Sequence, residues 1–176
     1  MRDWRHCPRC AAALLRAVSE GDDEERLVCP ACGLVLYENP APTASALAVD
    51  ADGRVLLTRR GIEPFLGMWD APGGFIRPGE SGEEAVRREL REETGLEIAV
   101  GEVLAIVPDT YGEDGTATLN VFYLARTVGG HPAPASDVSE LAWLAPAELP
   151  GAGQIAFRCV AEALAQWRSR PIVNEP

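Results

Sequence analysis

The alternation of apolar and polar residues along the chain predicts five β-strands. They cover Thr43–Val49, Arg54–Thr58, Glu97–Val107, Thr116–Arg126 and Val138–Leu144. The first two strands flank the turn sequence Asp50-Ala-Asp-Gly53, and this arrangement predicts a β-hairpin.

Helical spacing of apolar residues occurs in two segments. Glu83–Thr94 contains no helix-breaking residue and places Val86 and Leu90 on one face, where they can pack against a sheet. An N-cap, a capping-box partner and a C′ glycine mark its ends: Ser81, Glu84 and Gly95. A second helix is predicted at Gln154–Arg168, after a short helical turn at 146–149. Strands and helices together predict an α+β fold.

Three acids share one face of the first predicted helix. Glu89, Glu92 and Glu93 stand at positions i, i+3 and i+4. Their like charges repel unless a cation lies among them, and carboxylate oxygens suit a hard divalent ion such as Mg²⁺ or Mn²⁺. The alternative is an acidic helix face that is simply solvated.

The residues around these acids follow a known motif. In order, separated by gaps of five, seven, one and one residues, they are Gly74, Glu80, Arg88-Glu89-Leu90, Glu92-Glu93 and Gly95-Leu96. This order matches the Nudix box at every defined position, so residues 43–170 resemble a Nudix hydrolase domain. The resemblance implies an α/β/α sandwich with a mixed β-sheet, and it favours the metal-site interpretation.

The resemblance also implies roles for the residues of the box. The ligands of a catalytic Mg²⁺ (or Mn²⁺) would be the backbone carbonyl of Gly74 and the carboxylates of Glu89, Glu92 and Glu93. Arg88 and Glu80 would form the salt bridge that orients these glutamates. The reaction implied is hydrolysis of the diphosphate bond in a nucleoside diphosphate linked to another group.

The carboxylate that takes the proton of the attacking water has several candidates. Glu93 and Glu92 belong to the box, whereas an acid on another loop would act from outside it. Glu113, in the 109–115 loop, is the external candidate, and its alternative role is that of a solvated turn residue.

Two Cys-x-x-Cys pairs, eighteen residues apart, lie near the start of the chain: Cys7, Cys10, Cys29 and Cys32. This spacing is typical of a four-cysteine zinc site, and a closed shell of four thiolates makes the zinc structural. Two disulfides are the alternative. We therefore expect a small zinc ribbon at 1–36, joined by a proline-containing linker at 37–42 to the domain at 43–170.

The charge balance limits the partners. The chain has 27 acidic against 16 basic residues, a formal net charge of −11, and the predicted ribbon is not basic either. Nucleic acid is therefore not an expected partner. No apolar run is long enough to cross a membrane and no signal peptide is recognisable, so a cytoplasmic protein is expected. The resemblance allows a homodimer, which composition does not establish.

Residues outside the box would contact the substrate. Arg59 and Arg60 follow a predicted strand and could reach the phosphates, or they could be exposed charges at a strand end. Trp69 could stack on a nucleobase, although a place in the core is the favoured interpretation.

The substrate itself is expected to be a small nucleotide-derived molecule. The segment from Leu56 to the end of the box resembles ADP-ribose pyrophosphatases, so ADP-ribose or a similar nucleotide sugar leads. A four-cysteine ribbon before the domain also resembles NADH pyrophosphatases, which makes NAD(H) the second candidate. Residues 106–113 do not match the Ser-Gln-Pro-Trp-Pro-Phe-Pro run of those enzymes. A nucleotide-sensing regulatory protein is the non-enzymatic alternative, and the intact box argues against it.

Overall fold

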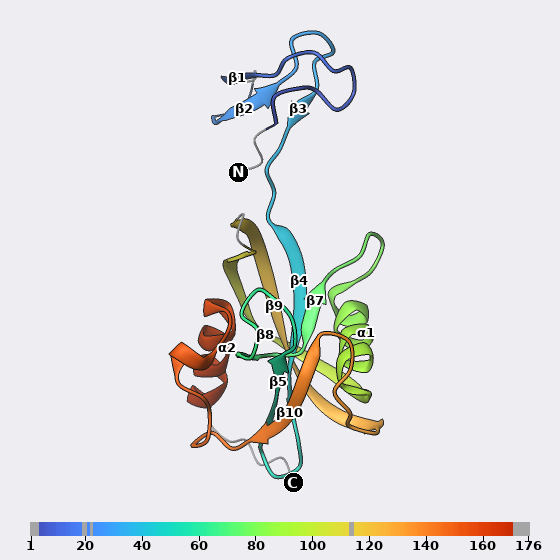
Figure 1. Cartoon of the computed structure of the whole chain (residues 1–176), viewed down its shortest axis with the longest axis vertical. Helices are drawn as coiled ribbons and strands as arrows, with labels where there is room; N and C mark the ends of the chain where they lie inside the picture. Colours follow the sequence, from blue (N-terminus) through green and yellow to red (C-terminus); the bar gives the residue numbers. More distant parts are fainter. Residues whose placement is uncertain (1–3, 19–20, 22, 113–114, 171–176) are drawn as a thin grey trace. The chain divides into compact units, whose positions relative to one another are not determined.

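The computed structural model describes residues 4–18, 21, 23–112 and 115–170, and the chain divides into two units, Met1–Asn39 and Pro40–Pro176 (Figure 1). The first unit contains three short antiparallel strands in the order β1-β2-β3: β1 (Leu15–Val18), β2 (Glu25–Val28) and β3 (Val35–Leu36). Among its described residues only Cys7 and Cys29 are buried. With so little apolar burial, this unit depends on another source of stability, such as a metal ion.

The second unit is built on a seven-stranded mixed sheet. Its strands are β4 (Ala41–Val49), β5 (Val55–Arg60), β6 (Trp69–Asp70), β7 (Gly73–Phe75), β8 (Leu96–Tyr111), β9 (Thr116–Gly130) and β10 (Val138–Leu144). The main order is β10-β5-β4-β9-β8, in which β4 and β9 are parallel and the other neighbours are antiparallel.

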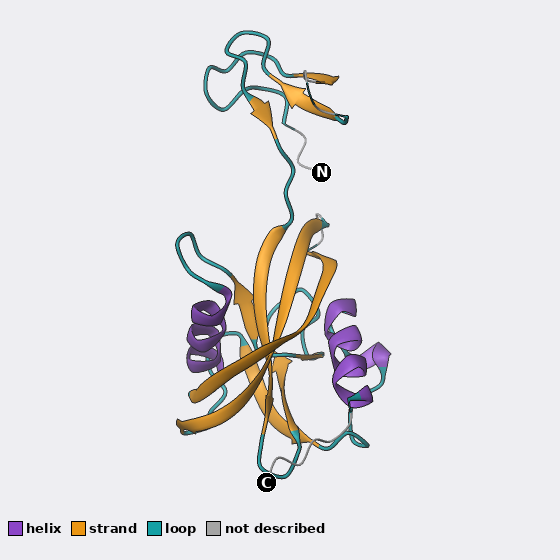
Figure 2. Cartoon of the chain, turned by 180° about the vertical axis from the view of Figure 1, so that it is seen from behind, coloured by secondary structure: helices purple, strands orange, loops and turns teal. Residues whose placement is uncertain are grey.

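Two helices cover opposite faces of this sheet (Figure 2). They are α1 (Gly82–Thr94) and α2 (Arg158–Ser169), the latter preceded by the 3₁₀ turn Ala152–Gln154. On the α1 side, Val86 and Leu90 are fully buried against sheet residues such as Leu56. On the α2 side, Val160 and Leu164 pack against a cluster that contains Phe122. The predicted α/β/α sandwich with a mixed sheet is confirmed.

The sheet is split between β4 and β5. These strands pair only at Val49 and Val55 and then separate, because β7 pairs with β4 and β6 pairs with β5. The connection Ala71–Pro72 is buried in between. The split therefore holds the segment that leads, through β7 and residues 76–81, into α1.

Several element boundaries differ from the prediction. The second helix begins at Arg158 and not at Gln154, because the Ala156 N–H donates to the Trp69 carbonyl at 2.8 Å and holds the backbone extended there. β8 and β9 are longer than predicted. β4 already begins at Ala41, inside the segment predicted as a linker, where it pairs with Thr118. No described helix has the length and hydrophobicity needed to span a bilayer.

Candidate active site

The ends of α1 are formed as the sequence predicts. The Ser81 hydroxyl accepts a hydrogen bond from the Glu84 N–H at 3.2 Å, and the Glu84 carboxylate accepts one from the Ser81 N–H at 2.8 Å. Gly95 adopts a left-handed conformation with φ of 69°, and its N–H donates to the Arg91 carbonyl. Such caps contribute about 1 kcal/mol each to helix stability, so α1 holds its side chains on a well-defined frame.

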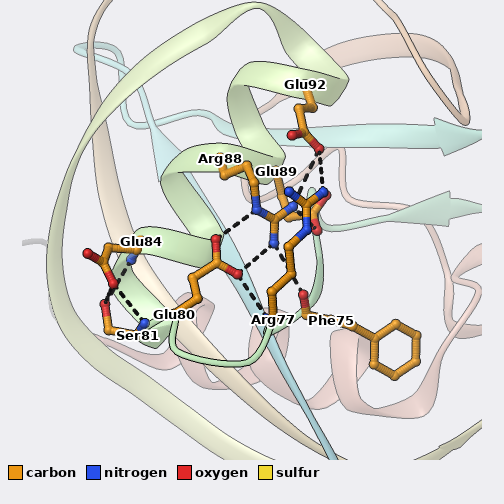
Figure 3. A network of polar contacts seen from close by, with 8 residues as sticks. All are labelled: Phe75, Arg77, Glu80, Ser81, Glu84, Arg88, Glu89 and Glu92. Carbon is orange, nitrogen blue, oxygen red and sulfur yellow. Dashed lines mark hydrogen bonds and ion pairs between the residues drawn. The ribbon is translucent and has the colours of Figure 1, made fainter.

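Arg88 connects the acids of α1 with the preceding loop (Figure 3). Its guanidinium donates to both carboxylate oxygens of Glu80, at 2.7 and 2.9 Å, and to the Phe75 carbonyl at 3.2 Å. Its third nitrogen donates to Glu89 at 2.6 Å and lies 3.4 Å from Glu92. The hydrogen bonds from Arg88 lower the pKa of Glu80 to about 2, so this pair is ionised and fixed.

Glu93 is the most buried acid of the box, with 7% of its surface exposed. One of its carboxylate oxygens accepts a hydrogen bond from the Gly73 N–H at 3.1 Å. Burial, followed by the charges of Asp137 and Glu89, raises the pKa of Glu93 to about 9. A buried carboxylate with anionic neighbours is a place where a cation would be stabilising.

Gly74 lies directly against Glu89. A Cβ atom at Gly74 would fall 2.6 Å from the Glu89 Oε1 atom, which is closer than real Cβ atoms come. Glu89 and Glu93 therefore both pack on the Gly73-Gly74 backbone, whereas the Glu92 side chain is 46% exposed and lies beside Arg77 and Arg88.

These donors fit a divalent cation such as Mg²⁺. The carboxylates stand on one helical face. Because Gly74 has no Cβ, there is room beside Glu89 for the Gly74 backbone carbonyl to approach an ion. The three carboxylates are not gathered around one point in this structure. Among the described residues, four cysteines are the only group of three or more histidine, cysteine or acidic side chains whose ligand atoms all lie within 4.8 Å of one another.

Those cysteines form a compact cluster in the first unit. The Cys7 and Cys32 sulfurs are 3.6 Å apart, and those of Cys10 and Cys29 are 3.4 Å apart. A disulfide bond measures about 2.05 Å, so the structure contradicts the disulfide alternative. Tetrahedral zinc, with Zn–S bonds of about 2.3 Å, would place sulfurs roughly 3.8 Å apart, which is close to the observed separations.

The two Cys-x-x-Cys turns have the same backbone pattern. The Cys7 N–H donates to the Ala12 carbonyl, and the Cys7 carbonyl accepts from the Ala11 N–H. In the same way, the Cys29 N–H donates to the Leu34 carbonyl, and the Cys29 carbonyl accepts from the Gly33 N–H. This repetition presents two pairs of sulfurs to one point, as a four-thiolate zinc site requires.

A pocket with an empty volume of about 490 Å³, open mouth included, begins at the backbone of Gly73–Phe75. Its lining includes a buried polar group centred on Asn120. The Asn120 amide donates to the Val107 carbonyl and to the Thr118 hydroxyl, both at 3.0 Å, and accepts from the Thr43 hydroxyl at 2.6 Å. Both amide N–H groups of Asn120 are therefore already used within the protein.

Arg60 lines this pocket, and two of its three guanidinium nitrogens are paired within the protein, whereas its buried Nη2 atom has no hydrogen-bond partner among the described residues. Its guanidinium donates to Asp70 at 3.0 Å and to the Pro64 carbonyl at 2.6 Å, and it lies 5.2 Å from the centre of the Phe157 ring. Burial raises the pKa of Asp70 to about 6 in spite of this arginine. Arg60 thus organises one wall of the pocket.

Arg59 and Trp69 lie outside the pocket lining. Arg59 stacks on the Trp69 ring at 4.3 Å and pairs with Glu140 at 2.6 Å, and Trp69 packs against the core beneath α2. These two residues therefore stabilise the fold around β5 and β6. Glu113, the external candidate for the general base, lies outside the described residues.

The sequence patterns did not point to Asp70, Asp137 or the phenylalanines of the pocket, Phe75 and Phe157. Asp137 follows a loop whose Ala135 N–H donates to the Glu93 carbonyl, and its own carbonyl accepts from the Gly61 N–H. Asp137 is thereby placed near Glu93 by contacts across 44 residues of sequence, which no local spacing reveals. For Asp70 a signal existed, since it directly precedes the Ala-Pro-Gly-Gly run.

Together, the fold and the site define an α/β/α sandwich with an acidic loop-helix segment set into a split sheet. The family model described as "NUDIX domain" matches residues 39–164, and the one described as "Nudix N-terminal", a zinc ribbon, matches residues 5–38. The chain belongs to the Nudix family, and its N-terminal segment matches the zinc ribbon found in that family.

Relatives with this domain carry several names. An ADP-ribose pyrophosphatase of Methanocaldococcus jannaschii is 32% identical over 105 residues, which cover 60% of this chain and 62% of the relative. A NAD-capped RNA hydrolase NudC of Chromobacterium violaceum is 40% identical over 94 residues, 53% of this chain and 33% of the relative. A putative 8-oxo-dGTP diphosphatase 2 of Mycobacterium tuberculosis is 42% identical over 96 residues, which cover 54% of this chain and 67% of the relative.

The chain thus spans less than two thirds of the archaeal relative and one third of the NudC protein. A NUDIX hydrolase structure from Nitrosomonas europaea superposes with a TM-score of 0.81, covering 98% of this chain and 95% of that one at 24% identity. This likeness supports the fold alone.

Proposed function

We propose that this Nudix hydrolase uses Mg²⁺ to cleave the diphosphate bond of ADP-ribose or of a similar nucleotide sugar, releasing AMP and ribose 5-phosphate from ADP-ribose. The observation that carries the proposal is that the backbone of Gly73 and Gly74 contacts acids of the box and also lines the pocket. Gly73 donates to Glu93, Gly74 lies against Glu89, and both glycines also line the pocket. A nucleoside in the pocket would place its diphosphate beside the carboxylates.

The residues of the box would divide the work. Gly74, Glu89, Glu92 and Glu93 would hold Mg²⁺, which would neutralise the diphosphate and lower the pKa of a water molecule. Arg88, fixed by Glu80, would keep Glu89 in one orientation. A carboxylate of the box would accept the proton of the attacking water.

Two observations support ADP-ribose as the leading substrate, and one favours a second candidate. A relative named ADP-ribose pyrophosphatase is 32% identical over 60% of this chain, and an acidic chain suits a small substrate better than a nucleic acid. NAD(H) is the second candidate, because a relative named NAD-capped RNA hydrolase is 40% identical over the matched region.

A substrate panel tests the proposal. Wild-type protein with Mg²⁺ is incubated with ADP-ribose, NAD, NADH and 8-oxo-dGTP at equal concentrations, and the nucleoside monophosphate released is quantified. Release of AMP fastest from ADP-ribose is the expected result. Faster release from NADH would establish the second candidate instead, and binding of these compounds without any turnover would contradict the proposal and favour a nucleotide sensor.

A further inference from the structure

Four aromatic rings from four separate segments form a continuous row at the pocket. The Phe65 and Phe157 rings are in edge contact at 5.2 Å, those of Phe157 and Tyr111 are stacked at 5.7 Å, and those of Tyr111 and Phe75 are in edge contact at 5.4 Å. Phe75, Tyr111 and Phe157 line the pocket. The row therefore runs from the segment between β5 and β6, past the start of α2, to β7, which leads into the box.

Asp109 ties the end of β8, which carries Tyr111, to the start of α2, which carries Phe157. Its carboxylate accepts a hydrogen bond from the Cys159 N–H at 2.8 Å and another from the Thr110 N–H at 2.9 Å. The N-cap residue of α2, Phe157, has no side chain that can cap the helix. Asp109 thus supplies the missing N-cap acceptor from another strand.

A second contact strengthens the same connection. Arg158 donates to the carbonyl of Pro108, the residue before Asp109. The Asp109 side chain is only 13% exposed. Burial alone would raise the pKa of Asp109, but the N–H groups of Cys159 and Thr110 outweigh it and the pKa is lowered. Asp109 is therefore an ionised and largely buried acceptor at the positive end of a helix.

The aromatic row provides ring surfaces at the pocket. The buried polar group around Asn120 has its amide donors already used, so it offers little for reading the edge of a base. Aromatic faces, in contrast, accept any base by stacking. The pocket wall formed by Tyr111, Phe157 and Phe75 is therefore better suited to bind the base than the buried polar group around Asn120.

We propose that Asp109 is a positioning residue for the nucleoside end of the substrate: by capping α2 it fixes the Tyr111–Phe157 pair on which the base stacks. This inference rests on the proposed function, since it assigns the pocket to the nucleoside. It adds a residue outside the box, 50 positions away in sequence from the helix that it caps.

The test compares Asp109→Ala and Asp109→Asn with Asp50→Ala as the matched control. Asp50 is also a nearly buried aspartate whose carboxylate accepts backbone N–H groups, from Asp52 and Arg54, but it lies in the β4–β5 turn. Asp109→Ala is expected to raise the KM for ADP-ribose about ten-fold with kcat changed less than about two-fold, because one stacked base is worth this much. Asp109→Asn keeps an acceptor oxygen, so its KM for ADP-ribose should stay close to that of the wild type. Asp50→Ala should leave KM unchanged.

Product inhibition separates positioning from a general loss of structure. AMP carries the base and ribose 5-phosphate does not. Asp109→Ala should weaken inhibition by AMP about ten-fold and leave inhibition by ribose 5-phosphate unchanged. Tyr111→Ala, which removes the ring and leaves the cap intact, should reproduce this pattern and carries the test if Asp109→Ala does not fold.

Three results would overturn the inference. One is an unchanged KM and unchanged AMP inhibition in Asp109→Ala, or in Tyr111→Ala where the former does not fold. Another is an equal loss of AMP and ribose 5-phosphate inhibition, which would mean a disturbed active site. The third is an equal rise of KM in Asp50→Ala. If the wild type hydrolyses no nucleoside diphosphate derivative, the proposed function itself fails, and that failure is visible before any variant is made.

Discussion

The Arg88 guanidinium holds both carboxylate oxygens of Glu80, at 2.7 and 2.9 Å, and uses its remaining nitrogen to hold Glu89 at 2.6 Å. All three side chains are about 15% exposed, so water competes little for these contacts. A bidentate ion pair of this kind fixes the orientation of the guanidinium as well as its distance from the carboxylate. The pair therefore sets the orientation of a carboxylate that we assign to the metal.

Arg88→Lys should lower kcat/KM about ten- to hundred-fold, the usual cost of losing an outer partner of a metal ligand. Lysine keeps the charge but cannot donate to Glu80 with two nitrogens and to Glu89 with a third. Arg87→Lys is the control, because Arg87 makes a single exposed pair with Glu83. Equal activity of the two variants would contradict the orienting role of Arg88.

Gly74→Ala should remove most of the activity and leave the melting temperature nearly unchanged. The three atoms nearest the new methyl group all belong to the Glu89 side chain, so this carboxylate would have to leave its place beside Arg88 while the backbone stays where it is. Steady-state kinetics and thermal melting of the purified variant measure both effects. Gly151→Ala is the control, since nothing lies within 4 Å of its Cβ position. Full activity of Gly74→Ala would show that Glu89 need not stay beside this glycine.

Binding of Mg²⁺ should release about one proton per chain near pH 7. The reason is that the pKa of Glu93 is raised to about 9, so this acid is protonated in the metal-free protein and must ionise to bind a cation. Calorimetric titration in two buffers of different ionisation enthalpy counts the protons. The exposed Glu97 provides the control: Glu97→Gln should release as many as the wild type, and a wild type that releases none would contradict the assignment.

The same pKa gives a prediction for stability without metal. An acid whose pKa rises on folding contributes stability below its ordinary pKa, 4.5 for Glu93, and loses it as the pH rises toward about 9. In buffer without divalent cations, Glu93→Gln should therefore melt at a higher temperature than the wild type, by an amount that grows from pH 5 to pH 9. An identical pH dependence of the two melting curves would contradict the burial of a protonated Glu93.

Cys10→Ser should lower the zinc content of the protein, expected at about one ion per chain, and unfold the first unit. The described residues of this unit include only two buried side chains, both cysteines, so no hydrophobic core would keep the unit folded without zinc. Elemental analysis and protease sensitivity of residues 4–39 measure the two effects, and Cys159→Ala should keep the full zinc content. Zinc-free wild-type protein with a protease-resistant first unit would contradict the zinc site.

The box and the zinc cysteines were predictable because their chemistry is local. Helical geometry places Glu89 and Glu93 on one face, and the capping residues of the same helix, Ser81 and Gly95, lie close to them in the sequence. The pocket was not predictable in this way. Its wall depends on pairs such as Asp109 with Cys159, which meet only after β8 and α2 pack together. The late start of α2 has the same cause, since Trp69 holds Ile155–Ala156 extended.

We assign Mg²⁺-dependent hydrolysis of a nucleoside diphosphate derivative to the glutamates of α1. The most direct measurement is the rate of AMP release from ADP-ribose, with and without Mg²⁺, by the wild type and by Glu93→Gln. We predict equal amounts of AMP and ribose 5-phosphate from the wild type only when Mg²⁺ is present, and a rate more than about a hundred-fold lower for Glu93→Gln. AMP release by Glu93→Gln at the wild-type rate, or wild-type release that is independent of divalent cations, would contradict the account.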